Sequence, residues 1–148
     1  MNENYPLRRF VEAQAYNYVD ALREIRNGRK ETHWMWYVFP QLRGLGRSYM
    51  AYTYGINGLE EAKAYLAHPI LSVRLIEITE ALLEYTDIII EDLIGDLDVL
   101  KLRSCMTLFA FLSEEGSVFH QVLDCFYDGK MDEHTIELIK QNQNKNHI

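Results

Sequence analysis

Residues 33 to 48 hold the most concentrated set of side chains that could form a ligand site. Both tryptophans of the chain, Trp34 and Trp36, lie there, and a Gly-Leu-Gly turn follows between Arg43 and Arg47. Aromatic rings can stack on a flat ligand and guanidinium groups bind phosphate oxygens, so the pattern favours a flat, phosphate-bearing ligand. The other interpretation is a dense hydrophobic plug followed by an ordinary loop, because large aromatic side chains are usually buried.

Two more residues of this stretch, His33 and Gln41, are candidate ligand-binding residues. His33 directly precedes Trp34, and Gln41 ends the aromatic block. Imidazole can take up or release a proton near neutral pH, so His33 is also the histidine best suited to chemistry.

Gln14 conflicts with the apolar stripe of the first predicted helix, where it lies between Val11 and Tyr18. A buried amide without hydrogen-bond partners costs about 1–3 kcal/mol, so a partner is expected. That partner is either the backbone of a neighbouring loop or a bound ligand. Glu12, two residues earlier, is then the nearest carboxylate in sequence and a candidate catalytic group.

Lys101 and Ser104 form a polar strip on a helix predicted over residues 98 to 112, whose other faces are apolar. A buried ammonium group is unfavourable unless it is paired or faces a cleft. Asp98 lies three residues before Lys101, so an intrahelical ion pair is the structural explanation. A site in a cleft, with Asp98 as a second candidate catalytic carboxylate, is the functional one.

Several common catalytic patterns are absent from the sequence. It has no Gly-x-Ser-x-Gly elbow, no Walker-type phosphate loop and no His-Glu-x-x-His motif. The five histidines and two cysteines show no metal-ligand spacing, so we expect neither a metal nor a cofactor. The Gly-Leu-Gly turn lacks the third glycine and the preceding strand of a dinucleotide fingerprint.

Composition and charge place the chain among compact globular proteins. A chain of 148 residues with 48% hydrophobic content fits one domain with its own core. The net charge is −7, which argues against broad nucleic-acid binding, yet the first 54 residues have eight basic against five acidic residues and suit a small anionic ligand. We expect a cytoplasmic protein with no membrane association, because long apolar runs and a signal-peptide pattern are missing and both cysteines look like free thiols.

Helical periodicity dominates the chain and predicts a mainly α single domain over residues 1–148. We expect about seven helices packed around the helix of residues 98 to 112, because that helix is apolar on nearly every side. Residues 34 to 39 are predicted to form a short helix, and Gly28 to end the first long one. Further predicted helix starts are a capping box from Asn57 to Glu60 and N-caps at Asp98, Ser117 and Asp132.

Motifs spread over nearly the whole chain resemble one known family. The segments are Phe10-Val-Glu-Ala-Gln14, His33-Trp-Met-Trp-Tyr-Val-Phe-Pro-Gln41, Tyr65-Leu66, His68-Pro69 and Lys101-Leu-x-Ser-x-Met-Thr-Leu-Phe109. They resemble the bacterial domain of unknown function 1810 family, whose members are often labelled calpastatin. Cys105 departs from the resemblance, which implies a serine there. The family implies no established function, and a calpain inhibitor would be a disordered, repeat-bearing chain, which this composition contradicts.

A more distant resemblance implies a chemistry. Phe10-Val-Glu-Ala-Gln14 and Tyr65-Leu-Ala-His-Pro69 are similar to segments of the NADAR-type N-glycosidases, which act on ADP-ribose and related conjugates. Such cleavage passes through an oxocarbenium-like state that a carboxylate, here Glu12 or Asp98, can stabilise. Arg43 and Arg47 would then hold phosphates, and Trp34 or Trp36 would stack on the base.

These observations leave two hypotheses for the function. The first is an enzyme that binds a nucleotide- or ADP-ribose-like ligand and hydrolyses an N-glycosidic bond, with Glu12 and Asp98 as catalytic residues. Its candidate ligand-binding residues are Gln14, His33, Trp34, Trp36, Gln41, Arg43, Arg47, Lys101 and Ser104. The second is a non-catalytic protein-binding module that uses the tryptophans together with Tyr49 and Tyr52. A cleft that joins these segments favours the first, and an exposed aromatic patch favours the second.

Overall fold

The computed structural model describes residues 6 to 145 and consists almost entirely of helices. The helices are α1 (Arg8–Arg26), α2 (Met35–Val38), α3 (Tyr49–Thr53), α4 (Gly58–Ala67), α5 (Leu71–Leu82), a 3₁₀ turn (Leu83–Tyr85), α6 (Ile90–Ile94), α7 (Val99–Phe111), α8 (Val118–Tyr127) and α9 (Glu133–Lys145). The mainly α class is confirmed. The predicted number of seven is wrong, since this part of the chain forms nine α-helices. The sequence prediction that the N-terminus has no signal peptide rests partly on residues 1 to 5, which lie outside the described residues.

The two helices α3 and α6 account for much of this difference. Each has five residues. A helix this short completes little more than one turn, so no apolar periodicity develops along it that a sequence pattern could reveal.

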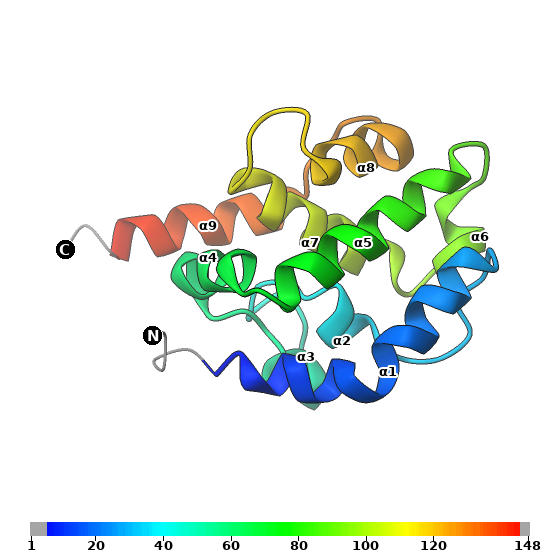
Figure 1. Cartoon of the computed structure of the whole chain (residues 1–148). Helices are drawn as coiled ribbons and strands as arrows, with labels where there is room; N and C mark the ends of the chain where they lie inside the picture. Colours follow the sequence, from blue (N-terminus) through cyan, green and yellow to red (C-terminus); the bar gives the residue numbers. More distant parts are fainter. Residues whose placement is uncertain (1–5, 146–148) are drawn as a thin grey trace.

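Helix α7 lies in the middle of the molecule, between α5 and α9 (Figure 1). It packs against α6, α8 and α9, while α1 packs against α2 and α5 on the other side of the fold. Helix α4 in turn contacts α5 and α9, so the longer helices enclose one continuous core. No helix among residues 6 to 145 is both long enough and apolar enough to cross a membrane.

The central position predicted for α7 is confirmed, but its burial on nearly every side is not. Leu102 and all residues from 104 to 110 are buried, whereas Leu100 is 65% exposed and Phe111 is 42% exposed. The neighbouring helices cover the middle of α7 and leave parts of its two ends in contact with solvent. An apolar pattern along the sequence does not show where the covering helices end.

Helix ends agree with the predicted signals at some positions. Gly28 adopts φ +84° after α1, and the Arg29 N–H bonds the Glu24 carbonyl at 3.0 Å, so this end is confirmed. The Ser117 hydroxyl accepts a hydrogen bond from the His120 N–H at 3.3 Å, and Asp132 accepts one from the Thr135 N–H at 2.9 Å. These two predicted caps are also confirmed.

Asn57 and Asp98 do precede α4 and α7 as predicted, but the capping contacts predicted for them are wrong. The Asn57 N–H bonds the Glu61 carboxylate at 2.8 Å, so the glutamate that reaches back to the start of α4 is Glu61 and not Glu60. The Asp98 side chain makes no capping hydrogen bond to α7. Its carboxylate contacts Lys30 instead, a pairing between distant parts of the chain that competes with the local cap.

Helix α2 confirms the short helix predicted within residues 34 to 39. One turn is long enough to give the two tryptophans different environments. Trp34, just before the helix, is 1% exposed and belongs to the core, whereas Trp36 is half-buried. This difference decides which indole can meet a ligand.

Candidate functional site

A pocket of about 340 Å³ opens between the loop that precedes α2 and the start of α7. The loop contributes polar side chains, α2 contributes an indole, and the segment from α6 to α7 contributes the opposite wall. The polar and aromatic residues that line it are Lys30, Glu31, His33, Trp34, Trp36, Asp96, Asp98 and Lys101. The pocket thus combines two indole rings, three carboxylates, two ammonium groups and an imidazole.

The Asp98 carboxylate lies between two lysines, and its two oxygens are held differently. Lys30 Nζ lies 2.9 Å from Oδ2, and the Lys30 side chain is only 7% exposed. Lys101 Nζ lies 3.5 Å from Oδ1, and the Lys101 side chain is 32% exposed. A charge-assisted hydrogen bond is about 2.7–2.9 Å long, so the contact with Lys30 is close and the contact with Lys101 is loose.

Trp36 is the indole that the pocket offers to a ligand. Lys101 Nζ lies 5.4 Å from the centroid of its ring, and part of the ring remains accessible. Trp34 also borders the pocket, but its side chain is almost fully buried and its Nε1 donates to Glu24 Oε1 at 3.0 Å. Gln41 lines a small cavity that shares Trp36 and Lys101 with the pocket.

Glu24 positions the loop that carries Lys30, His33 and Trp34. Its carboxylate accepts hydrogen bonds from the backbone N–H groups of Glu31 and Thr32, the Thr32 hydroxyl and the Trp34 indole. Burial alone raises the pKa of this carboxyl, but the hydrogen bonds from Thr32, Trp34 and Glu31 outweigh burial and lower the pKa to about 2. We did not predict this role. Glu24 follows Ala21 by three residues and precedes the apolar Ile25, and this position on the apolar face of the helix indicates a buried carboxylate.

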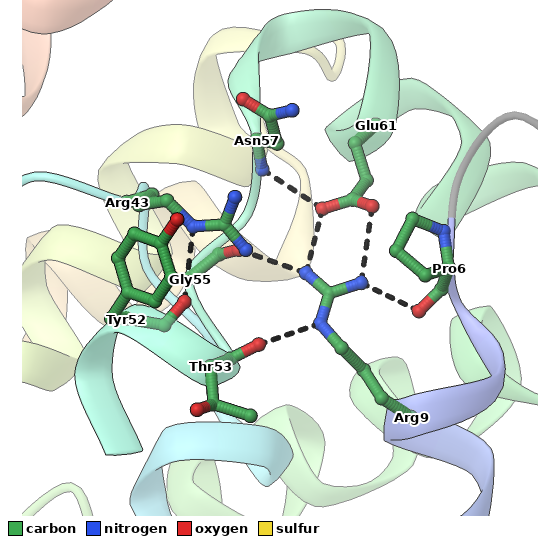
Figure 2. A network of polar contacts seen from close by, with 8 residues as sticks. All are labelled: Pro6, Arg9, Arg43, Tyr52, Thr53, Gly55, Asn57 and Glu61. Carbon is green, nitrogen blue, oxygen red and sulfur yellow. Dashed lines mark hydrogen bonds and ion pairs between the residues drawn. The ribbon is translucent and has the colours of Figure 1, made fainter. Parts of the chain in front are cut away.

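A second polar cluster centres on Arg9 and Glu61 (Figure 2). Arg9 binds both oxygens of the buried Glu61 carboxylate, at 2.8 and 3.1 Å. Its remaining N–H groups donate to the backbone carbonyls of Pro6, Thr53 and Gly55. All five donors of the guanidinium group are therefore used, and the cluster joins α1 to α4, to the end of α3 and to the segment that follows α3. We interpret this cluster as a structural contact between these segments, because Arg9 has no donor left for a ligand.

Gln14 and Glu12 lie outside the pocket. The Gln14 amide is buried, and its Nε2 donates to the Tyr37 carbonyl at 2.7 Å and to the Tyr65 hydroxyl at 3.0 Å. Burial raises the pKa of Tyr65 well above its usual value, so this hydroxyl stays protonated. Glu12 is exposed and pairs with Arg8 on the outer face of α1.

Arg43, Arg47 and Ser104 also lie away from the pocket. Arg43 Nε donates to the Tyr52 carbonyl at 3.0 Å, and the guanidinium lies 4.6 Å from the centroid of the Tyr52 ring. Arg47 is exposed, and the buried Ser104 donates to the Leu100 carbonyl one turn earlier, at 3.0 Å. The structure therefore brings together five of the eleven candidate residues at one pocket, namely His33, Trp34, Trp36, Asp98 and Lys101.

Fold and pocket together define a small helical protein whose candidate site lies where one loop meets the start of the central helix. Residues 4 to 139 match the family model described as "Protein of unknown function (DUF1810)", and the chain belongs to that family. It is similar to the crystal structure of the conserved hypothetical protein Rv1873 from Mycobacterium tuberculosis, with 46% identity and a TM-score of 0.90 over 93% of this chain and 99% of that one. The comparison with curated proteins found no match.

Neither of these matches names an activity. They also leave open the calpastatin label and the resemblance to the NADAR-type N-glycosidases. Among the residues whose positions are described, no three His, Cys, Asp or Glu side chains are grouped so that they could hold a metal ion.

Proposed function

We propose that the pocket between the α2 loop and α7 binds a small nucleotide-like molecule of the ADP-ribose type. The observation that carries the proposal is the position of the half-buried Trp36 ring beside Lys101 and Asp98, all three on the wall of one pocket. A flat base needs an aromatic face, and phosphates and sugar hydroxyls need charged or polar partners.

Each side chain has a distinct role in this proposal. The Trp36 indole stacks on the base, a contact worth about 1–3 kcal/mol per base in proteins that bind single-stranded nucleic acids. Lys101 is available for a ligand oxygen, because its contact with Asp98 is loose at 3.5 Å. His33 is exposed and also lines the pocket, so it can donate or accept a hydrogen bond to the ligand.

The reaction we propose is hydrolysis of the N-glycosidic bond of such a ligand. The bond between the sugar C1′ and the base nitrogen breaks, its electron pair leaves with the nitrogen, and a proton joins that nitrogen. Water adds its oxygen to C1′ and gives up a proton. Asp98, the one of the two predicted carboxylates that borders the pocket, would stabilise the oxocarbenium-like state, and His33 would supply the proton.

A non-catalytic binding module is the second candidate function. Helix α3 exposes Tyr49 and Tyr52, with Arg43 stacked on the latter, which is a composition typical of contact surfaces between proteins. Trp34 cannot contribute to such a surface because it is buried.

Thermal shift and isothermal titration calorimetry with adenosine monophosphate, ADP-ribose and NAD test the proposed function. A ligand at a hundred times its Kd stabilises the folded state by about 2.7 kcal/mol and raises the Tm. We expect Trp36→Ala to weaken binding about tenfold or more. The matched control is Tyr49→Ala, an exposed aromatic away from the pocket, which should bind like the wild type.

Catalysis is tested separately by following release of the free base chromatographically. Base release that Asp98→Asn abolishes supports hydrolysis, whereas binding without base release limits the function to binding. If none of the three ligands binds, or if Trp36→Ala binds as tightly as the wild type, the proposed site is wrong and the α3 surface becomes the better candidate.

A further inference from the structure

We infer that the pocket selects ligands with a free ribose hydroxyl, which binds between Asp98 Oδ1 and Lys101, and that Lys30 is the positioning residue for Asp98. This inference rests on the proposed function, because it names the part of a nucleotide-like ligand that the site recognises. The two Asp98 oxygens lie in unequal environments, at 2.9 Å from Lys30 and 3.5 Å from Lys101.

Oδ2 of Asp98 is used within the protein. The Lys30 ammonium lies 2.9 Å from it and also donates to the Thr32 carbonyl at 2.6 Å. The same ammonium lies 5.0 Å from the centroid of the Trp34 ring. Lys30 is thus enclosed by partners on several sides, and its almost complete burial holds the Asp98 carboxylate in one orientation.

The backbone around Lys30 is also held by hydrogen bonds. The Lys30 N–H donates to the Leu93 carbonyl at 2.7 Å, which links the loop to α6. The next residues, Glu31 and Thr32, donate to the Glu24 carboxylate. Lys30 therefore has a fixed position from which it can orient Asp98.

Oδ1 of Asp98 retains hydrogen-bonding capacity toward the pocket. Lys101 Nζ lies 3.5 Å from this oxygen, and the Lys101 side chain is partly exposed. An ionised carboxylate oxygen only accepts hydrogen bonds, so a ligand group that binds it must donate. An ionised phosphate oxygen has no hydrogen, so it cannot serve as that donor.

A hydroxyl fits this pair of groups better than an amine does. Asp98 Oδ1 can accept a further hydrogen bond, and Lys101 Nζ, which lies 3.5 Å from it, can donate one to a ligand. A hydroxyl both donates and accepts, whereas an ammonium or a base amino group offers essentially donors alone. Lys101 also borders the Trp36 ring, so the hydroxyl would lie next to the stacked base, where the sugar of a nucleotide is found.

Calorimetric titration with adenosine monophosphate and its 2′-deoxy and 3′-deoxy analogues tests this inference. Loss of a hydrogen bond to a charged group should weaken the binding of at least one deoxy analogue about tenfold to a hundredfold in the wild type. In Asp98→Asn the ratio between the ribo and deoxy affinities should fall toward one. The ratio is informative because loss of structure would weaken all three ligands together.

Lys30→Met should lower the same ratio, because the carboxylate loses its fixed orientation. The matched control is Arg29→Met, which removes an exposed cation from the adjacent position and should leave the ratio as in the wild type. If Asp98→Asn or Lys30→Met does not fold, the wild-type ratio alone decides. Equal binding of all three nucleotides overturns this inference and leaves the proposed function standing, whereas no binding of any of them overturns the proposed function itself.

Discussion

The Trp34 indole N–H donates to the Glu24 carboxylate at 3.0 Å, and this contact joins the start of α2 to the buried side of α1. Glu24 Oε1 also accepts from the backbone of Glu31 and Thr32, and Oε2 accepts from the Thr32 hydroxyl. One carboxylate thus organises the loop that forms one wall of the pocket. Its removal should affect both stability and ligand binding.

Glu24→Gln should destabilise the fold much less than Glu24→Ala. Glutamine keeps a carbonyl oxygen for the donors at Oε1, and the Thr32 hydroxyl can rotate to accept from the new amide. We expect a loss of about 1–2 kcal/mol for glutamine and about 3 kcal/mol or more for alanine, which leaves several donors unpaired. Urea unfolding measures both values, and equal losses would show that the hydrogen bonds contribute little.

The Glu24 carboxylate should make stability depend on pH in the acid range. Its pKa of about 2 in the folded protein lies below the ordinary value of 4.5, so its ionised form stabilises the fold above about pH 4.5. This contribution declines as the pH falls from 4.5 toward 2. The free energy of unfolding of the wild type should therefore approach that of Glu24→Gln over this range, and a constant difference between them would contradict the assignment.

The pair formed by Arg9 and Glu61 should be far more important for stability than its neighbour in sequence. Glu61→Gln leaves a largely buried guanidinium without its counter-charge, and we expect a loss of about 3 kcal/mol or more. The control is Glu60→Gln, since Glu60 is exposed and forms a surface pair with Lys63 at 3.4 Å, where the change should be below about 1 kcal/mol. Thermal unfolding of the two variants in parallel gives the comparison.

Gln14→Leu should lower stability without changing the affinity for a ligand of the pocket. The Tyr37 carbonyl and the Tyr65 hydroxyl lose their partner, at a cost of about 1–3 kcal/mol. Ligand titration of the folded variant provides the second measurement. A selective loss of affinity with unchanged stability would instead make Gln14 a ligand-binding residue. Glu12→Gln, on the exposed face of α1, should change neither quantity appreciably.

Tryptophan fluorescence should report a ligand chiefly through Trp36. Trp34 is buried and its indole N–H is already bonded, so a nucleotide in the pocket should quench chiefly Trp36. Trp36→Phe retains an aromatic ring for stacking but should abolish most of the quenching. If quenching persists in this variant, the ligand contacts Trp34 or binds elsewhere.

The sequence alone determined the features that depend on residues close together in the chain. Periodicity over three and four residues predicted the long helices, Gly28 predicted the end of α1, and Ser117 and Asp132 predicted two helix starts. It also pointed to Trp36, Asp98 and Lys101, because each conflicts with an apolar pattern or lies in the aromatic block. A helix is stabilised by contacts between residues three and four positions apart, so a local sequence pattern can predict it.

Only the tertiary structure decided which of these side chains meet. The contact between Lys30 and Asp98 joins a loop to the start of α7 and replaces the local cap that we predicted at Asp98. The partners of Gln14 lie in α2 and α4, and Leu100 is 65% exposed although it belongs to the central helix. Pairings between distant segments depend on how the helices pack, and a local pattern contains no information on which distant group will lie opposite a given side chain.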